Sequence, residues 1–180
     1  MTMLDPRYPV GKFDPGDQTP LGALIDQLAA LPDQVMELVS DLDDAKLDTP
    51  YREGGWTARQ VVHHLADSHL NAYTRFRLGL TEEGPTIRAY DEKRWAELAD
   101  ARHGPVQPSL ALLEGLHDRW VWLLRGLAPR DLQRVIIHPE RGEMTLERLL
   151  RLYAWHCRHH LGHLEIVKGS GLQAPGSGEA

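Results

Sequence analysis

The strongest constraint on the fold is helical periodicity in four long segments of the chain. Apolar residues recur every three or four positions over about 19–42, 57–81, 109–127 and 145–168, which is the spacing of one face of an α-helix. One short segment, 134–145, has β-like and turn-forming sequence, so no parallel sheet can be built. The chain is therefore predicted to be all-α, a four-helix bundle with a small hairpin before the last helix.

Local signals predict where the helices begin. The expected N-terminal residues are Thr19, Thr57, Ser109 and Thr145. Pro20 follows the first of them at a position that favours proline, and Gln60 completes a capping box with the second. Pro32 lies inside the first segment, where its missing N–H predicts a kink or step.

The connections predict a single bundle domain with a crossover. The link 82–108 is interrupted by Gly84 and Pro85 and has room for one short helix around 91–99, so simple up-down-up-down topology is not required. With 180 residues and 42% hydrophobic residues, one core is expected over 19–168. Residues 1–18 are predicted to form an extended surface arm, and 169–180 a flexible tail.

Charge and composition argue against several classes of partner. The net charge of −6 and the lack of Lys/Arg clusters do not fit nucleic acid or anionic lipid. No long apolar stretch or secretory signal is present, so a cytoplasmic protein without a membrane partner is expected. The single cysteine, Cys157, excludes an intrachain disulfide framework and a Cys-rich zinc module.

The last predicted helix carries four histidines within 156–163. They could form a metal site, a general acid/base cluster, or a run of partly exposed polar residues. On a helical wheel His160 lies within the apolar arc and His156 at its edge, whereas His159 and His163 are predicted to face solvent or a neighbouring subunit. His156 and His160 are four residues apart, the spacing by which one helix supplies two ligands to one metal.

A third ligand must come from a facing helix, and 57–81 offers several histidines. His63 and His64 flank its apolar stripe on opposite sides, and the wheel does not choose between them. His69, near the middle of the stripe, is interpreted as a core or near-site polar group. Four other residues are interpreted as packed, structural or exposed groups without a site role: Cys157, His103, His117 and His138.

Several separated sequence blocks occur together in order: "DTPYREGGWTARQVVHHLADSHLNAYTRFRLGLTEE", "YDEKRW", "LLEGLHDRW" and "LYAWHCRHHLGHLE". With them the chain resembles the YfiT branch of the DinB-like superfamily, whose members are described as metal-dependent hydrolases. The likeness extends from "YPVGKF" to the end of the last helix. It implies a four-helix bundle with crossover topology and one divalent metal ion, zinc or nickel, held by three histidines.

The resemblance also implies which histidines bind the metal. One family ligand stands in a W-x7-H-[LI] pattern, which maps here to Trp56 and His64. The other two form an H-x3-H pair on the last helix, which maps to His156 and His160. Where many members carry glutamine this chain has His163, so a fourth imidazole could lie near the site.

Three function hypotheses follow from such a site. Three neutral imidazoles leave the charge of the metal uncompensated and one coordination position open, as in catalytic zinc sites. Activated water would make the protein a hydrolase of an amide, ester or similar bond in a small molecule. A bound low-molecular-weight thiol would make it an S-transferase, since related DinB-like proteins resemble enzymes that use bacillithiol or mycothiol. A non-catalytic metal-binding dimer is the third hypothesis, with an interface drawn from His159, His163, Trp120, Trp122 and Trp155.

Two further residues are weaker site predictions. Asp67 lies one turn from His64 and is predicted to orient that imidazole or accept a proton, unless it is only a solvated surface carboxylate. Arg52, in the loop "YREGGW", is predicted to line the pocket and bind a substrate carboxylate. Alternatively, the glycines of this loop only permit a tight turn. Exposed aromatic surface makes a homodimer the expected assembly.

Overall fold

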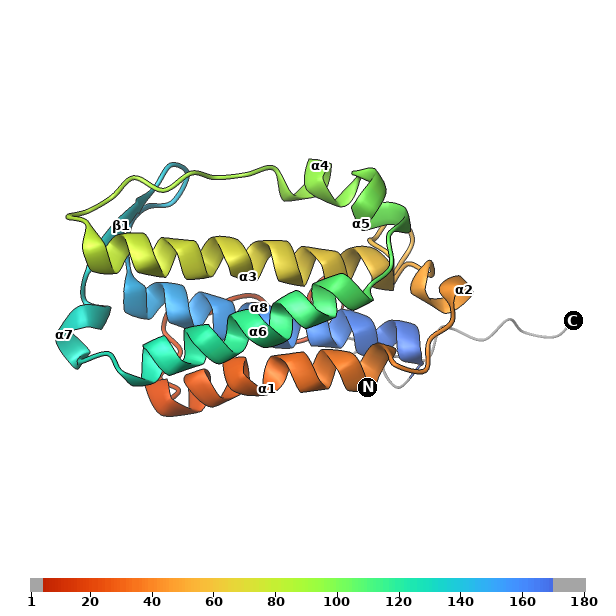
Figure 1. Cartoon of the computed structure of the whole chain (residues 1–180), viewed down its shortest axis with the longest axis horizontal. Coiled ribbons are helices and arrows are strands. Elements are labelled where there is room, and N and C mark those ends of the chain that lie inside the picture. The colour runs from red at the N-terminus through yellow and green to blue at the C-terminus, as the bar shows by residue number, and fades with distance from the viewer. Residues whose placement is uncertain (1–4, 170–180) are drawn as a thin grey trace, which may run out of the picture.

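The computed structural model describes residues 5–169, in which four long helices form a bundle (Figure 1). The long helices are α1 (Leu21–Val39), α3 (Ala58–Thr81), α6 (Gln107–Arg125) and α8 (Leu146–Lys168). Short helices in the connections are α2 (Asp44–Leu47), α4 (Glu92–Ala96), α5 (Ala99–His103) and α7 (Pro129–Leu132). The all-α prediction is confirmed.

The order of the helices in space is not their order in the sequence. Both α1 and α3 pack against α6 and α8, so α1 and α3 occupy opposite corners of the bundle. Figure 1 shows that α3 and α6 run in the same direction, and the link 82–106 therefore returns along the length of the bundle and carries α4 and α5. The predicted crossover is confirmed.

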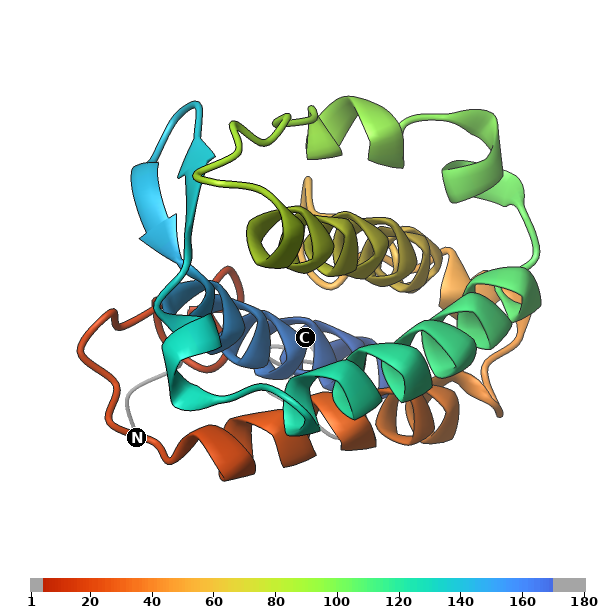
Figure 2. The same ribbon diagram turned by 60° about the vertical axis from the view of Figure 1, so that its left-hand side comes forward.

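The predicted hairpin is also present, as strands β1 (Val135–His138) and β2 (Gly142–Thr145). They pair antiparallel and lie with the link outside the four long helices, on the side of α3 (Figure 2). Ile136 and Met144 are opposite each other and both buried, as alternation on a half-buried strand requires. Two backbone hydrogen bonds of Ile137, to Pro85 and Ile87, attach the hairpin to the link.

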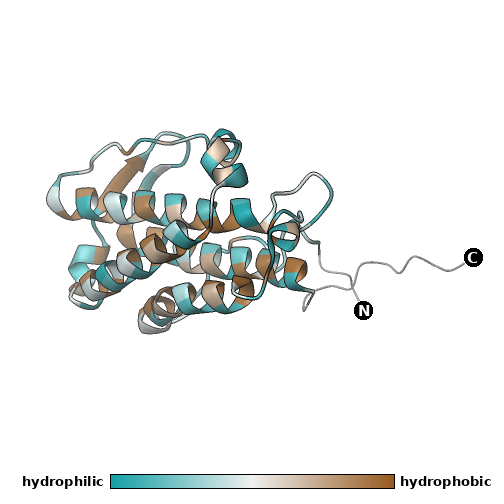
Figure 3. Ribbon diagram, turned by 45° about the vertical axis from the view of Figure 1, so that its right-hand side comes forward, coloured by the Kyte–Doolittle hydropathy of each residue, from teal (hydrophilic) through white to brown (hydrophobic). Residues whose placement is uncertain are grey.

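The core is built from the apolar stripes that the sequence predicts. Apolar and polar residues alternate along each long helix in Figure 3, and none of the helices within 5–169 is both long and apolar enough to cross a bilayer. Trp120 packs in the centre against Phe76 and Tyr153 and is fully buried. The hypothesis that Trp120 contributes to a subunit interface is therefore wrong. Trp122 is 81% exposed, whereas Trp155 donates its Nε1–H to the backbone of the N-terminal arm.

Two of the four predicted helix starts are confirmed. Thr57 and Thr145 cap α3 and α8 through their side chains, and Thr57 forms the complete capping box. Thr19 does not cap α1, because its hydroxyl donates to the carboxylate two residues before it. Helix α6 begins two residues before Ser109, and α1 continues through Pro32.

The N-terminal arm covers the face of α8 that points away from the bundle. Residues 5–18 contain turns but no helix, and Pro9 lies so close to Gly162 that a Cβ there would come within 2.7 Å of the proline ring. Tyr8 contacts the ring of His159, and Phe13 contacts Trp155. Residues 1–4 and the predicted tail beyond Gly169 lie outside the described residues, and the domain boundaries stay a prediction.

Candidate metal centre

Three imidazoles from two helices converge where α3 packs on α8. His64 comes from α3, and His156 and His160 come from consecutive turns of α8; each offers a ring nitrogen within 4.8 Å of the others. The Nε2 atoms of His64 and His156 are 3.1 Å apart. Two nitrogens on one tetrahedral zinc ion are separated by about 3.3 Å, given Zn–N bonds of about 2.0–2.1 Å. The three side chains therefore fit a single metal ion.

All three imidazoles are neutral at pH 7. Burial lowers the pKa of His64 to about 4. Burial, together with the neighbouring histidines, also holds the pKa of His156 and of His160 well below the ordinary value. Because metal and proton compete for the same lone pair, this environment favours metal binding at neutral pH.

The tautomer of His156 depends on a proline in another helix. Pro32 has no N–H, so the carbonyl of Leu28, four residues earlier in α1, lacks its usual helical partner. Nδ1 of His117 donates to this carbonyl at 2.6 Å. Since burial lowers the pKa of His117 to about 4, its ring is neutral and its Nε2 is left as an acceptor.

The remaining hydrogen bonds lead from His117 to the cluster of His64, His156 and His160. Nδ1 of His69 donates to Nε2 of His117 at 2.8 Å, and Nδ1 of His156 donates to Nε2 of His69 at 3.1 Å. Because each neutral ring carries one N–H, this order leaves the lone pair of His156 Nε2 free and directed at His64. We refer to His117, His69 and His156 as the histidine chain. Metal-binding imidazoles are commonly held through their second nitrogen in this way.

His163 is buried at the same cluster, and the prediction that it faces solvent or another subunit is wrong. It is 2% exposed, because the arm covers this face of α8 and the Tyr51 ring stacks on it at 3.8 Å. Its Nδ1 lies 3.3 Å from Nδ1 of His160. With His159, these two rings form a second group of converging nitrogens. A neutral His160 has one free lone pair, so the two groups cannot both hold an ion through it.

The cluster forms part of the wall of a cavity of about 740 Å³. The loop 51–56 forms another part, as predicted, and the ring of Trp56 lies 4.7 Å from that of His64. Gly54 has φ of +65°, and a Cβ on Gly55 would lie 2.8 Å from the Arg52 side chain. Both glycines are needed for the path of the loop, which supports the conformational interpretation. The loop also lines the cavity, while a role in substrate binding stays a prediction.

Asp67 and Arg52 make contacts that differ from their predicted roles. Within residues 5–169 no hydrogen bond joins the Asp67 carboxylate to an imidazole, and burial together with Asp100 raises its pKa to about 6. Nη1 of Arg52 donates to the backbone carbonyl of Glu53 at 2.8 Å, and its guanidinium lies over the Tyr51 ring. Both roles stay predictions.

The structure separates two neighbours that the helical wheel left equivalent. His63 bonds to Ser109 Oγ at 2.8 Å and to the Gly104 carbonyl, away from the cluster.

Cys157 is buried in the core, and burial raises the pKa of its thiol. His117 was not predicted to serve the site, although its place four residues after Leu113 on the apolar stripe of α6 could have indicated an inward ring.

Comparison with known proteins identifies the family. A family model described as "DinB superfamily" matches residues 27–164. The chain belongs to the DinB superfamily. A relative from Bacillus cereus (strain 03BB102) is 50% identical over 169 residues, covering 92% of this chain and 97% of the relative, and is named "Putative metal-dependent hydrolase". A Bacillus mycoides (strain KBAB4) relative with the same description is 48% identical over 174 residues, with the same coverage.

Solved structures of similar proteins agree with the bundle. YfiT from Bacillus subtilis matches with a TM-score of 0.88 and 45% identity over 93% of this chain and 98% of its own, and is described as a probable metal-dependent hydrolase with an unusual four-helix bundle topology. TT2238, a four-helix bundle protein, matches with a TM-score of 0.55 at 24% identity over 79% of this chain and 95% of its own, which supports the fold alone. The names of these DinB superfamily relatives agree with metal dependence, while the three ligands here stay a prediction.

The histidine chain leads to a testable expectation for this DinB superfamily site. The substitution His69→Phe keeps an aromatic ring but removes the acceptor for His156 Nδ1–H and the donor to His117. We expect zinc affinity to fall about 10- to 100-fold, the usual effect of losing such a partner. Chelator competition measures the affinity, and the ¹⁵N shifts of His156 report whether its proton stays on Nδ1.

The control is His63→Phe, the same substitution one position before His64 but outside the cluster. Its zinc affinity should stay within about twofold of wild type, because His63 bonds only to α6 and the link. If His69→Phe binds zinc like wild type with an unchanged His156 tautomer, the histidine chain does not position this ligand.

Proposed function

We propose that this protein is a metal-dependent hydrolase of a small molecule, in which His64, His156 and His160 hold one divalent ion, zinc or nickel. The observation that carries the proposal is the convergence of three neutral imidazoles on the wall of a 740 Å³ cavity. Structural zinc sites are closed by four protein ligands, whereas three ligands leave a position for water or substrate. The names of the DinB superfamily relatives support the same activity.

The protein groups around the cluster have separate tasks in this proposal. When bound, the ion supplies Lewis-acid chemistry, polarising a carbonyl oxygen and lowering the pKa of water towards neutrality. The histidine chain holds His156 in the tautomer that presents Nε2. His163 contacts Nδ1 of His160 and orients that ring. The Trp56 ring packs against His64 at the wall of the cavity.

Two side chains next to the cluster in sequence that could act as a protein nucleophile, Cys157 and Ser68, are unreactive or engaged. The thiol of Cys157 is buried and its pKa is raised, so it does not form a thiolate at neutral pH. Ser68 Oγ donates to the Tyr153 hydroxyl at 3.4 Å, without a histidine base beside it in residues 5–169. This pattern favours attack by water over a covalent enzyme intermediate.

The test is turnover by the full-length protein loaded with zinc or nickel. A panel of small aryl esters and anilides is assayed with metal, with chelator, and after one equivalent of metal is restored. We expect at least about 100-fold faster hydrolysis with metal, lost in His64→Ala and retained in His63→Ala. Conjugation of low-molecular-weight thiols to an electrophile is measured in parallel. Conjugation without hydrolysis would replace the proposal by an S-transferase, and bound metal without either activity would leave a binding module.

A further inference from the structure

Arg75 is a buried cation that no side chain of residues 5–169 neutralises. It is 8% exposed. Its Nη1 donates to the Tyr153 hydroxyl at 3.4 Å and its Nη2 to the Arg88 carbonyl at 3.2 Å, both neutral acceptors. None of the ion pairs formed within residues 5–169 includes it. A guanidinium keeps its charge in proteins, so this positive charge is buried without a counter-ion.

A second arginine of α3 shows what a structural buried arginine looks like in this protein. Arg59 is 5% exposed, and it bonds to the carboxylates of Asp48 at 2.6 Å and Asp44 at 2.7 Å. Its Nη1 donates to the Gly104 carbonyl at 3.0 Å. Burying a charge is unfavourable unless it is paired, so the unpaired Arg75 calls for a partner that comes from outside the chain.

Arg75 lines the same cavity as the three histidines. It follows His64 by eleven residues, about three turns, and therefore lies on the same face of α3. The Tyr153 hydroxyl that Arg75 contacts also donates to the backbone carbonyl of Ser68, one turn from His64. Eleven residues span about 16 Å along the helix between the Cα atoms of His64 and Arg75. Tyr153 lies between the two groups, because its hydroxyl accepts from Arg75 and its ring centroid is 5.5 Å from that of His156.

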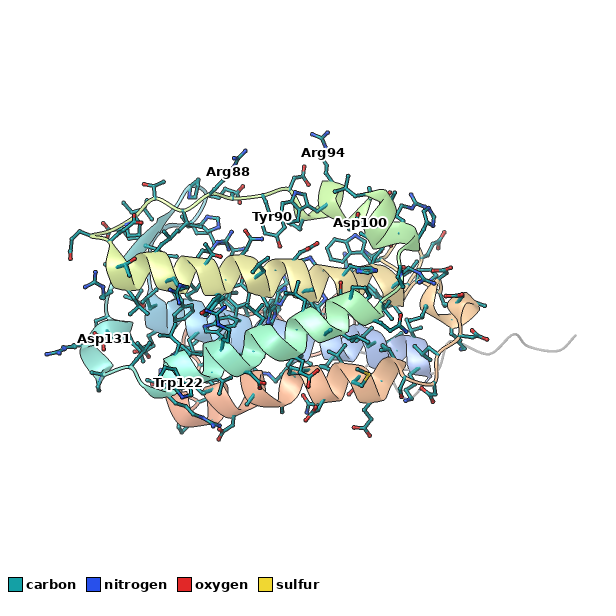
Figure 4. The ribbon with its side chains drawn as sticks, viewed as in Figure 1. Arg88, Tyr90, Arg94, Asp100, Trp122 and Asp131 are labelled. Atoms are coloured by element: carbon teal, nitrogen blue, oxygen red, sulfur yellow. The ribbon has the colours of Figure 1, made fainter. Side chains whose placement is uncertain are left out.

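The cavity near Arg75 offers hydrogen-bond donors, and its lining includes the basic side chains of Arg52, Arg75, Lys93 and Arg141. Tyr90 lies between the link and α3, whereas Arg88 and Arg94 point away from the bundle (Figure 4). Burial raises the pKa of Tyr90 and of Tyr153, so both hydroxyls keep their protons. The acidic residues that line the cavity are all exposed: Glu92, Glu97 and Glu140.

We propose that Arg75 binds a carboxylate group of the substrate, while the bond to be hydrolysed lies at the cluster of His64, His156 and His160. The placement of the reacting bond at the three histidines rests on the proposed function. The binding of a carboxylate by Arg75 does not depend on it. The charge decides between oxyanions: one buried guanidinium balances one carboxylate, whereas a phosphate monoester brings close to two negative charges. A carboxylate also matches the planar fork of the guanidinium.

This inference moves the carboxylate anchor away from the residue that the sequence indicated. Arg52 is only partly buried and donates from Nη1 to its own loop, although its Nε has no hydrogen-bond partner within residues 5–169. The more deeply buried charge of Arg75, at 8% exposure, favours Arg75 as the anchor. The signal for Arg75 was present in the sequence, because an interval of eleven residues places it on the face of His64. Its burial and lack of a carboxylate partner appear only in the fold.

The experiment measures butyrate binding to the full-length protein by NMR, with and without one equivalent of zinc. Butyramide is the uncharged isostere, and inorganic phosphate tests the other oxyanion. We expect butyrate to bind in both states, at least tenfold more tightly than butyramide or phosphate, and to shift the Nε–H signal of Arg75. Arg75→Gln should weaken butyrate at least tenfold. The control is Arg88→Gln, which removes an equal charge from a side chain that points away from the bundle. It should change the affinity for butyrate less than twofold.

Three results would overturn the carboxylate site: no saturable butyrate binding by the wild-type protein, equal binding by Arg75→Gln, or tenfold tighter binding of phosphate. If Arg75→Gln does not fold, Arg75→Lys and the wild-type Nε–H signal decide the same question. Butyrate binding by a protein that has no hydrolytic activity when loaded with zinc or nickel refutes the proposed function alone. Metal-dependent hydrolysis without butyrate binding at Arg75 refutes this inference alone.

Discussion

His64→Ala, His156→Ala and His160→Ala are each expected to lower zinc or nickel affinity by more than about 100-fold, beyond the 10- to 100-fold loss typical of an outer partner. Each removes one of three nitrogens that lie within 4.8 Å of one another, and two imidazoles form a weak site. Elemental analysis of the purified variants, with chelator competition for affinity, measures the effect. Wild type should carry about one ion per chain if the three-ligand site is correct.

The matched control is His159→Ala, a histidine of the second group only. Its ring stacks on Trp155 and meets the arm, so its loss should leave metal content near the wild-type value. If His159→Ala loses the metal while His64→Ala keeps it, the ion belongs to the group of His159, His160 and His163. If none of the four variants changes metal content, the cluster is structural.

The metal-free protein is expected to lose stability steeply as the pH falls from 6.5 to 5.5. Five histidines are less than 9% exposed: His64, His69, His117, His160 and His163. Burial lowers the pKa of each, to about 4 for His64 and His117 and about 3 for His163. The unfolded chain, with pKa values near 6.5, takes up protons in this window and the folded chain does not. Stability is therefore complete above pH 6.5 and decreases below it.

The expected size follows from the number of protons involved. Relative to pH 7.5, each such histidine lowers the free energy of unfolding at pH 5.5 by about 1.4 kcal/mol, so the five together lower it by about 7 kcal/mol. This is comparable to the whole stability of a domain, about 5–15 kcal/mol. Urea unfolding of metal-free protein at pH 7.5, 6.5 and 5.5 measures the effect. His103→Gln alters an exposed histidine and should leave the pH dependence unchanged. A urea midpoint that stays constant from pH 7.5 to 5.5 would show that these rings are not held neutral.

The sequence predicted the helices and core well, because their determinants are local. Hydrogen bonds within a helix and the placement of apolar residues on one face depend on spacing alone, and the predicted stripes are buried. The Thr57 capping box is equally local and is present. Thr19 and Ser109 were wrong as helix starts because their hydroxyls bond elsewhere, to Asp17 and to His63 on another helix.

The candidate site was predicted in part. The i,i+4 spacing of His156 and His160 is a property of one helix, so periodicity alone paired them. Periodicity could not separate His63 from His64, which flank the stripe symmetrically, and the resemblance to the family selected His64. The structure then places His64 with the pair and His63 against α6, because the packing of α3 on α8 sets the direction of each ring.

The sequence by itself determined the helical class, the core residues and the i,i+4 spacing of the candidate ligands His156 and His160 on α8, since each follows from the period of an α-helix. Tertiary structure alone decided three features of the site. The arm buries His163, Pro32 of α1 frees the carbonyl that orients the histidine chain, and Arg75 is enclosed without a carboxylate. Each of these involves segments far apart in the chain, and a helical wheel describes only one helix at a time.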